Sequence, residues 1–194
     1  MFGAGLGAGL LFILAAGILA VTVTGTVTSF ASGETVSAAK INENFASLKA
    51  AIEGIPDCTE NSASLKMSAN ANVTNNTLNV LSWDVEEFDS QNMHAAADPT
   101  RVTISTAGRY LVIGHLSYAA NSSGNRQIRI LKNGVLWTVN NVQAPGFAAI
   151  FDLTAVMDLA AGDYLEIGAV QNSGGTLQVE ASENRFQVVR LCGN

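Results

Sequence analysis

Apolar and polar residues alternate along the chain from Ser62 towards the C-terminus, and a turn signal follows about every ten residues. A period of two places alternate side chains on opposite faces of a strand, whereas a helix has a period near 3.6. Val102 and Ile104 alternate in this way ahead of the turn Thr106–Gly108, and Asn133–Gly134 is typical of a tight hairpin turn. Roughly eight to ten strands without a helix predict an all-β two-sheet sandwich or jelly roll.

The segment Tyr110–Tyr118 is apolar at both odd and even positions. It therefore predicts a central strand that is covered on one face by the second sheet and on the other by a neighbouring subunit. The remaining long strands are expected at Gln127–Leu131, Val135–Val139, Phe147–Leu159, Tyr164–Gln171, Leu177–Ala181 and Arg185–Leu191.

Between Gly33 and Gly54 the apolar residues recur at alternating steps of three and four, which is the spacing of a coiled-coil helix. The positions of this stripe are Ala38, Ile41, Phe45, Leu48, Ile52 and Ile55. Gly54 followed by Pro56 predicts the end of the helix. A helix of this length is marginal alone, so the stripe packs either against other copies of the chain, as a stalk, or against its own domain.

The first 33 residues contain no charged side chain, and residues 1–23 are apolar or small throughout. At about 1.5 Å per residue, such a helix covers the roughly 30 Å hydrocarbon core of a bilayer. The missing Lys or Arg argues against a secretory signal, yet Ser29 and Ala31 are small enough for a cleavage site. Three interpretations stay open: a retained membrane anchor, a cleaved signal, or a helix buried in a protein assembly.

Five segments, in this order, resemble the C1q/TNF-like jelly roll: Trp83–Phe88, Arg101–Tyr118, Ile130–Leu136, Leu159–Val170 and Phe186–Leu191. Ala107, Gly108 and Tyr110 stand at the turn that leads into the long apolar strand of that family, and Leu159–Asp163 is similar to its Leu-x-x-Gly-Asp turn. The resemblance implies a homotrimer of jelly rolls with both termini of each domain at the same base. A short stalk under such a trimer would be held together by the domains above it.

Phe30–Ile52 resembles a segment at the head of many secreted bacterial and phage fibre-type proteins, on the residues Ser32, Gly33, Asn42, Asn44 and Phe45. In those proteins a short helix precedes a β-domain. We therefore expect three parts: a hydrophobic anchor or signal at 1–32, a trimeric coiled-coil stalk at 33–56, and a C1q/TNF-like jelly-roll knob at 57–194.

The chain has two cysteines, Cys58 and Cys192, and neither stands in a metal-ligand spacing. The sequence leaves open whether they form a disulfide or remain free thiols. The jelly-roll resemblance implies that they are neighbours at the base of the domain. A bridge that closes so long a loop would stabilise the fold by about 4–5 kcal/mol in the chain-entropy model.

The formal net charge of −6, with only ten Lys and Arg, argues against a nucleic-acid partner. No nucleophile elbow, zinc-protease motif or phosphate-binding glycine loop is present in the sequence. His115 falls on an expected strand and His94 in an expected loop, without a motif that joins either to a nucleophile. We therefore expect no enzymatic activity, no cofactor and no metal site.

Polar loops and aromatic residues are the remaining candidates for recognition. The acidic residues Asp84, Glu86, Glu87 and Asp89 are interpreted as a solvated strand edge rather than a calcium site. Trp83 and Trp137 are expected in the core or at a subunit interface. Surface contacts with a glycan or protein receptor are expected in polar loops at Asn121, Arg126, Asn140, Asn141 and Asn172.

These observations favour a non-enzymatic, homotrimeric structural protein on the surface of a virus particle, such as a phage spike, head fibre or decoration protein. The N-terminal segment would attach it to a capsid or membrane, and the knob would face outward. One alternative is a bacterial adhesin that is secreted or anchored at the cell surface. Another, from a different class, is a fibre-borne glycan hydrolase.

Overall fold

The structure is a computed structural model that describes residues 27–53 and 61–191. These residues belong to two compact units, an N-terminal helical unit and a β-domain. Ile55, Cys58, Cys192 and residues 1–26 lie outside the described residues, so the cysteine pairing, the last stripe position and the leader stay predictions. No helix in the described ranges is long and apolar enough to cross a membrane.

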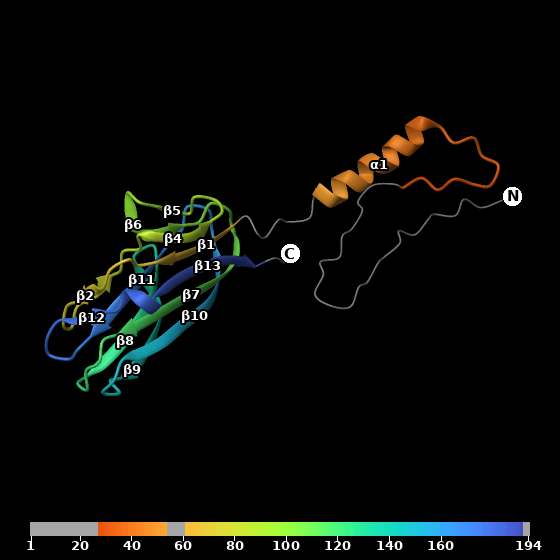
Figure 1. Cartoon of the computed structure of the whole chain (residues 1–194). Coiled ribbons are helices and arrows are strands. Elements are labelled where there is room, and N and C mark those ends of the chain that lie inside the picture. The colour runs from red at the N-terminus through yellow and green to blue at the C-terminus, as the bar shows by residue number, and fades with distance from the viewer. Residues whose placement is uncertain (1–26, 54–60, 192–194) are drawn as a thin grey trace. The chain divides into compact units, whose positions relative to one another are not determined.

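The β-domain is a sandwich of two antiparallel sheets (Figure 1). Sheet A has the order β2-β12-β7-β13-β1-β4, and β10 pairs with β7. Its strands are β1 (Ser62–Lys66), β2 (Ala71–Val73), β4 (Val85–Asp89), β7 (Gly108–Tyr118), β10 (Ala149–Leu159), β12 (Leu177–Val179) and β13 (Arg185–Leu191). The long strand β7 is central, as expected, because β13 and β10 pair along its two sides.

Sheet B has the order β5-β6-β11-β8-β9, with β3 paired to β11. Its strands are β3 (Asn79–Val80), β5 (His94–Ala95), β6 (Asp98–Thr103), β8 (Asn125–Lys132), β9 (Val135–Gln143) and β11 (Tyr164–Gln171). Asn133 and Gly134 both have positive φ, of 53° and 75°, which is the geometry of a type I′ hairpin turn. This confirms the predicted hairpin between β8 and β9.

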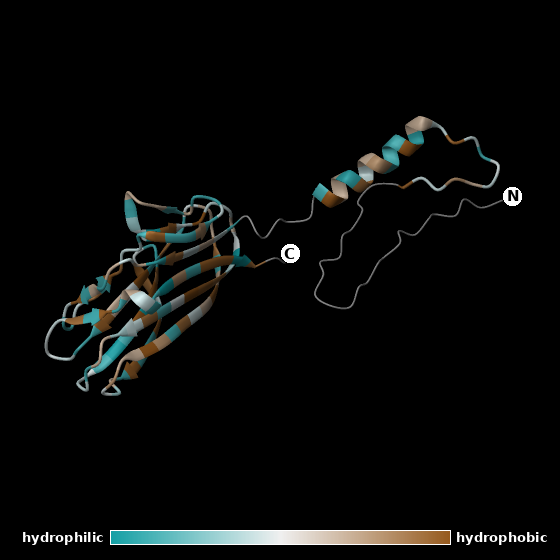
Figure 2. Cartoon of the chain, viewed as in Figure 1, coloured by the Kyte–Doolittle hydropathy of each residue, from teal (hydrophilic) through white to brown (hydrophobic). Residues whose placement is uncertain are grey.

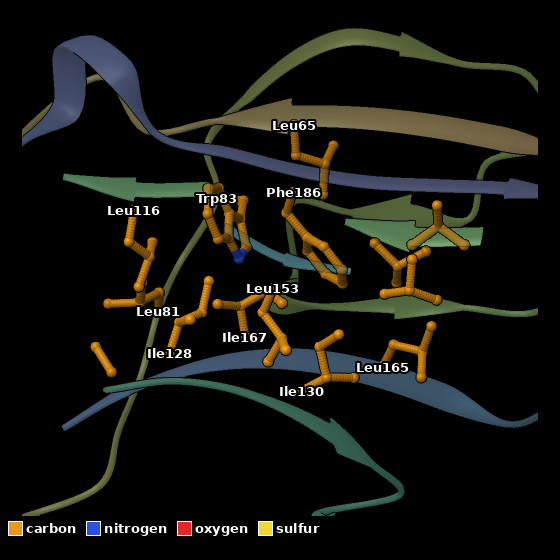
Figure 3. Packing of buried hydrophobic residues seen from close by; sticks show 14 of the residues in the cluster. Leu65, Leu81, Trp83, Leu116, Ile128, Ile130, Leu153, Leu165, Ile167 and Phe186 are labelled. Carbon is orange, nitrogen blue, oxygen red and sulfur yellow. The ribbon is translucent and has the colours of Figure 1, made fainter. Parts of the chain in front are cut away.

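The core lies between the sheets and takes side chains from both (Figure 3). Trp83 packs on Phe186 with ring centroids 5.6 Å apart. The Tyr118 hydroxyl crosses from sheet A to donate to the carbonyl oxygens of Gln127 (2.8 Å) and Val170 (3.2 Å) in sheet B. Burial raises the pKa of Tyr118 well above the usual range for tyrosine.

The predicted fold class is confirmed, and the predicted bounds of β11 and β13 match the structure. The other differences are local. The strand expected from Phe147 begins at Ala149, and the short strands β2, β3 and β5 raise the number of described strands to thirteen. A 3₁₀ turn, η1 (Ala181–Glu183), lies where no helix was expected.

The N-terminal unit contains the helix α1 (Ala38–Glu53), which begins five residues after Gly33. The Ser37 hydroxyl caps it by accepting the backbone N–H of Lys40 at 3.2 Å. Gly33, with φ of 83°, lies in the turn that precedes this cap and keeps residues 31–37 out of the helix. No residue of α1 is buried, so the apolar stripe at Ala38, Ile41, Phe45, Leu48 and Ile52 has no cover from its own chain within the described residues.

An extended segment precedes the helix and folds back beside it. The Asn44 side chain accepts the backbone N–H of Thr28 at 2.8 Å and donates to the Thr28 carbonyl at 3.0 Å. An ion pair between Lys40 and Glu34 (2.6 Å) holds the turn between the two elements. In residues 27–53, the N-terminal unit is therefore a hairpin of one segment without regular secondary structure and one helix.

Candidate functional site

Large apolar side chains are exposed along the edge where β9 and β10 meet. The β9–β10 edge is defined by Val135, Leu136, Trp137, Val139, Phe147, Ile150 and Val156, which are between 43% and 70% exposed. Ile150 and Val156 are opposite Ser117 and Leu111 of β7, so they also lie on the outer face of sheet A. Both strands carry hydrophobic segments in Figure 2. Asn140 Nδ2 donates to the Asp152 carbonyl at 2.8 Å and ties the two strands together. Single exposed apolar residues are ordinary, but a group of this kind marks an interaction surface.

A second apolar area lies on the outer face of sheet A. Directly opposed residues share a face, and Leu111 is opposite both Val189 of β13 and Val156 of β10. Ile113, two residues along β7, points to the same side, and these residues are only partly buried. The outer face of sheet A therefore has an apolar centre that continues into the β9–β10 edge through Val156.

Ion pairs border this apolar centre at both ends. At one end Arg109 Nε lies 2.9 Å from Asp158 Oδ1, and this hydrogen bond lowers the pKa of the Asp158 carboxyl. At the other end His115 Nδ1 lies 2.5 Å from Asp152 Oδ1, and Arg185 pairs with Glu87 at 3.2 Å. An apolar centre with ion pairs beside it suits a protein interface, and a partner that extends along β10 as far as Ile150 would also cover the His115–Asp152 pair.

The two histidines have different surroundings. His115 lies on β7 as predicted and is partly exposed on the outer face of sheet A. The loop prediction for His94 is wrong, because it lies in β5 and its side chain is almost fully buried. Its Nδ1 is 2.8 Å from Glu86 Oε1, and its Nε2 is 3.4 Å from the Pro99 carbonyl. These contacts give His94 a structural role beside the core.

The four acidic residues are occupied by donors of the protein itself. Asp84 accepts from the backbone N–H and the hydroxyl of Ser68, and its pKa is lowered by these bonds. Asp89 accepts the backbone N–H of Met93 (2.9 Å) and of His94 (2.8 Å). Across residues 27–53 and 61–191, no three His, Cys, Asp or Glu side chains gather as a metal site would need.

The expectation that Arg126 contacts a partner at the surface is wrong, because this side chain is fully buried. Its guanidinium donates to the carbonyl oxygens of Asn121 (3.2 Å), Ser123 (2.9 Å) and Asn125 (3.0 Å). Desolvation lowers the pKa of Arg126. The polar sequence around it concealed that β8 already begins at Asn125, which turns Arg126 inward.

The prediction that Asn140 and Asn141 lie in a loop is wrong, because β9 extends to Gln143 and includes both. Three of the predicted contact asparagines hold the backbone of the β-domain. Asn121 Oδ1 accepts the backbone N–H of Ser123 at 2.8 Å, Asn172 Oδ1 accepts that of Asn125, and Asn140 joins β9 to β10. Asn141 is exposed on β9. Of the predicted contact residues, Asn141 on β9 and Asn172 in its loop are therefore the exposed ones.

Trp83 is buried in the core, whereas Trp137 is 54% exposed at the β9–β10 edge. Sequence reasoning did not single out the other members of this edge. A signal was present, because Phe147–Leu159 carries apolar residues such as Ile150 and Val156 at positions that alternate with inward-facing ones. Apolar residues on both faces are typical of a strand that is covered on its outer face as well as on its inner face.

No protein-family model and no curated protein matches this chain. Solved structures do match the β-domain. The globular domain of zebrafish complement 1qA is 14% identical with a TM-score of 0.52, and the match covers 69% of this chain and 99% of that one. Murine APRIL at pH 5.0 is 12% identical with a TM-score of 0.54, covering 67% and 98%.

The Eiger TNF structure from S. frugiperda is also similar, at 14% identity and a TM-score of 0.52, with 69% of this chain and 94% of that chain covered. The β-domain therefore has the C1q/TNF-like jelly-roll fold. Identities this low establish the fold alone, and function has to be argued from the surfaces of this chain.

Proposed function

We propose that this chain is a non-enzymatic homotrimeric structural protein of a virus particle, a phage spike, head fibre or decoration protein with an outward-facing knob. One observation carries the homotrimer: each β-domain exposes an apolar surface that runs from the outer face of sheet A, across Val156, to the β9–β10 edge. The edge of one copy packing on the face of the next is a heterologous contact, and such contacts close into a ring when the rotation from one copy to the next is an integral fraction of a full turn. Three copies are the number that the C1q/TNF-like fold favours.

The N-terminal unit supports the same assembly. Ile41, Phe45, Leu48 and Ile52 of α1 are 38–66% exposed, and they lie at coiled-coil spacing. A helix of 16 residues is not stable by its helix propensity alone, so this stripe needs a partner. We propose that three copies of α1 form the stalk at 33–56 below the knob at 57–194, with 1–32 attached to capsid or membrane.

The absence of catalysis is part of the proposal. His94 is engaged by Glu86, and His115 by Asp152, at 2.8 Å and 2.5 Å. A carboxylate on Nδ1 also occurs in catalytic triads, so the other ring nitrogen is the one that decides: the Nε2 of His94 faces the Pro99 carbonyl oxygen rather than a nucleophile. The exposed amide of Asn141 and the rigid loops around Asn121 and Asn172 suit contact with a glycan or protein receptor at the virion surface.

The first test is the mass of the full chain in a mild detergent by light scattering. A trimer has a mass of about 61 kDa, three times 20.2 kDa. Val156→Glu places a charge where the edge meets the face and should give monomers, whereas the control Thr103→Glu on exposed β6 should remain trimeric. A monomeric wild-type chain refutes the assembly.

The second test concerns the particle. Antibodies against the β-domain should label purified virions, and the chain should co-purify with them at a fixed ratio to the capsid protein. Detection only at a bacterial surface would support an adhesin instead and reject the virion role. Release of sugar from a glycan array would reject the non-enzymatic role.

A further inference from the structure

A row of charged side chains crosses the outer face of sheet A at the level of His115. His115 lies opposite Asp152 on β10 and opposite Arg185 on β13. Its Nδ1 is 2.5 Å from Asp152 Oδ1. Arg185 Nε reaches Glu87 at 3.2 Å, and the Lys66 ammonium contacts the same carboxylate. His115 therefore stands between a carboxylate on one side and a cation on the other.

A third carboxylate faces the same row. Glu180 accepts a hydrogen bond at 3.3 Å from the hydroxyl of Ser117, which lies two residues after His115 on β7. The backbone N–H of Glu180 also donates to the Ser117 carbonyl at 2.8 Å, which fixes its position beside the strand. Counting both neighbouring strands, the row holds three carboxylates and two permanent cations.

The distribution of these charges is uneven. Glu87 has both permanent cations, because Lys66 and Arg185 contact it. Asp152 has His115 as its side-chain partner in the described part of the chain. The row is therefore one negative charge in excess when His115 is neutral and balanced when His115 is protonated.

This balance becomes important when the face is covered. The Asp152 side chain is 62% exposed in the single subunit, so water solvates its charge. Docking of a neighbouring copy on this face removes that water, and a carboxylate beside a neutral imidazole is then an uncompensated charge. A protonated imidazole forms an ion pair with it, and histidine is the side chain that normally changes charge between about pH 5 and pH 8.

We infer that each subunit takes up one proton at His115 when the subunits associate through this face, so that acid strengthens the assembly. This inference rests on the homotrimer proposed above. The sign follows from linkage: the assembled state binds more protons than the free subunits, so a fall in pH favours the assembled state. Three copies give an uptake of up to three protons per trimer.

The test is the trimerisation constant of the full chain, measured by sedimentation equilibrium at pH 8, 7 and 6 and constant ionic strength. Each proton taken up changes this constant by up to about tenfold per pH unit. We expect a rise of at least about tenfold between pH 8 and pH 6. His115→Gln should give weak association and a flat profile, although the chain's other histidine, His94, is still present.

Asp152→Asn removes the charge that requires the proton. It should also give a flat profile, but with association at pH 8 as strong as that of the wild type at pH 6. The matched control is Asp158→Asn at the opposite end of the same face, where the partner Arg109 is a permanent cation. This control should keep the wild-type pH dependence.

The outcomes separate this inference from the trimer itself. A trimer whose constant does not change with pH refutes proton uptake and leaves the trimer standing. A pH dependence that persists in His115→Gln assigns the proton to another group and also refutes the inference. Monomers at every pH refute the proposed trimer, and with it the inference on proton uptake that rests on the trimer. Circular dichroism of each variant at pH 8 and pH 6 verifies that the β-domain is folded.

Discussion

Ile150→Ala is the most direct quantitative test of the β9–β10 edge. Ile150 lies on β10 and is 51% exposed, so about half of its surface is available for burial by a neighbouring copy. Full burial of an isoleucine side chain contributes about 1.5–3 kcal/mol, and half of it about 1 kcal/mol at each contact. A ring of three has three such contacts, so the variant should lose about 3 kcal/mol of association free energy.

This loss corresponds to a trimerisation constant lowered about 150-fold. Sedimentation equilibrium over a range of protein concentrations measures it directly. The control is Val80→Ala, which shortens an exposed β-branched side chain on β3 of sheet B, away from the edge. Thermal unfolding of the dissociated Ile150→Ala subunit should match that of the wild-type subunit. An unchanged trimerisation constant would refute the assignment of this edge to the subunit interface.

Three further variants test the internal structure of the chain. Tyr118→Phe removes two hydrogen bonds between the sheets and should lower the free energy of unfolding in urea by about 1–3 kcal/mol. Because burial raises the pKa of Tyr118, the stability it contributes is present below about pH 10 and is lost as the pH rises further, and Tyr118→Phe should remove this loss. Arg126→Met should cost about 2 kcal/mol and speed amide exchange in residues 121–125, because three carbonyl oxygens lose their donor. Asn44→Ala should speed amide exchange at Thr28 at least about tenfold, while Asn42→Ala leaves it unchanged.

The fold was predictable from local signals that agree with one another. The alternation of apolar and polar residues, the Asn133–Gly134 turn and the apolar central strand are local signals, and together they indicate a β-sandwich. The bounds of the long strands Tyr164–Gln171 and Arg185–Leu191 followed from the same alternation. The short strand β5 was missed because two residues carry no readable period.

The candidate surface was harder to predict, because exposure depends on packing that the local sequence does not encode. Arg126 stands among polar loop residues in the sequence, yet the pairing of β8 turns it into the protein, where backbone carbonyls surround it. His94 likewise stands in a polar stretch of the sequence, but it lies on β5, which pairs with β6, and its side chain contacts Glu86 of β4. The alternation within β10 did contain the outward apolar positions, but only the sheet order shows that β10 forms an edge within the described β-domain.

In the described residues, each of the two units leaves an apolar surface uncovered, and we expect the β-domains to associate before the helices do. Helix α1 buries none of its own residues and cannot hold a defined association alone, because nucleating and pairing so short a helix is unfavourable. The β-domain buries a core with side chains from both sheets, so we expect it to fold before its edge and face associate. Association of the β-domains would raise the effective concentration of the three helices, and the stalk would then form as an intramolecular step. Variants of the β9–β10 edge should therefore abolish stalk formation. Phe45→Ala on the stripe should weaken the trimer without abolishing it. Circular dichroism at the helical minimum, measured across a dilution series, distinguishes these two outcomes.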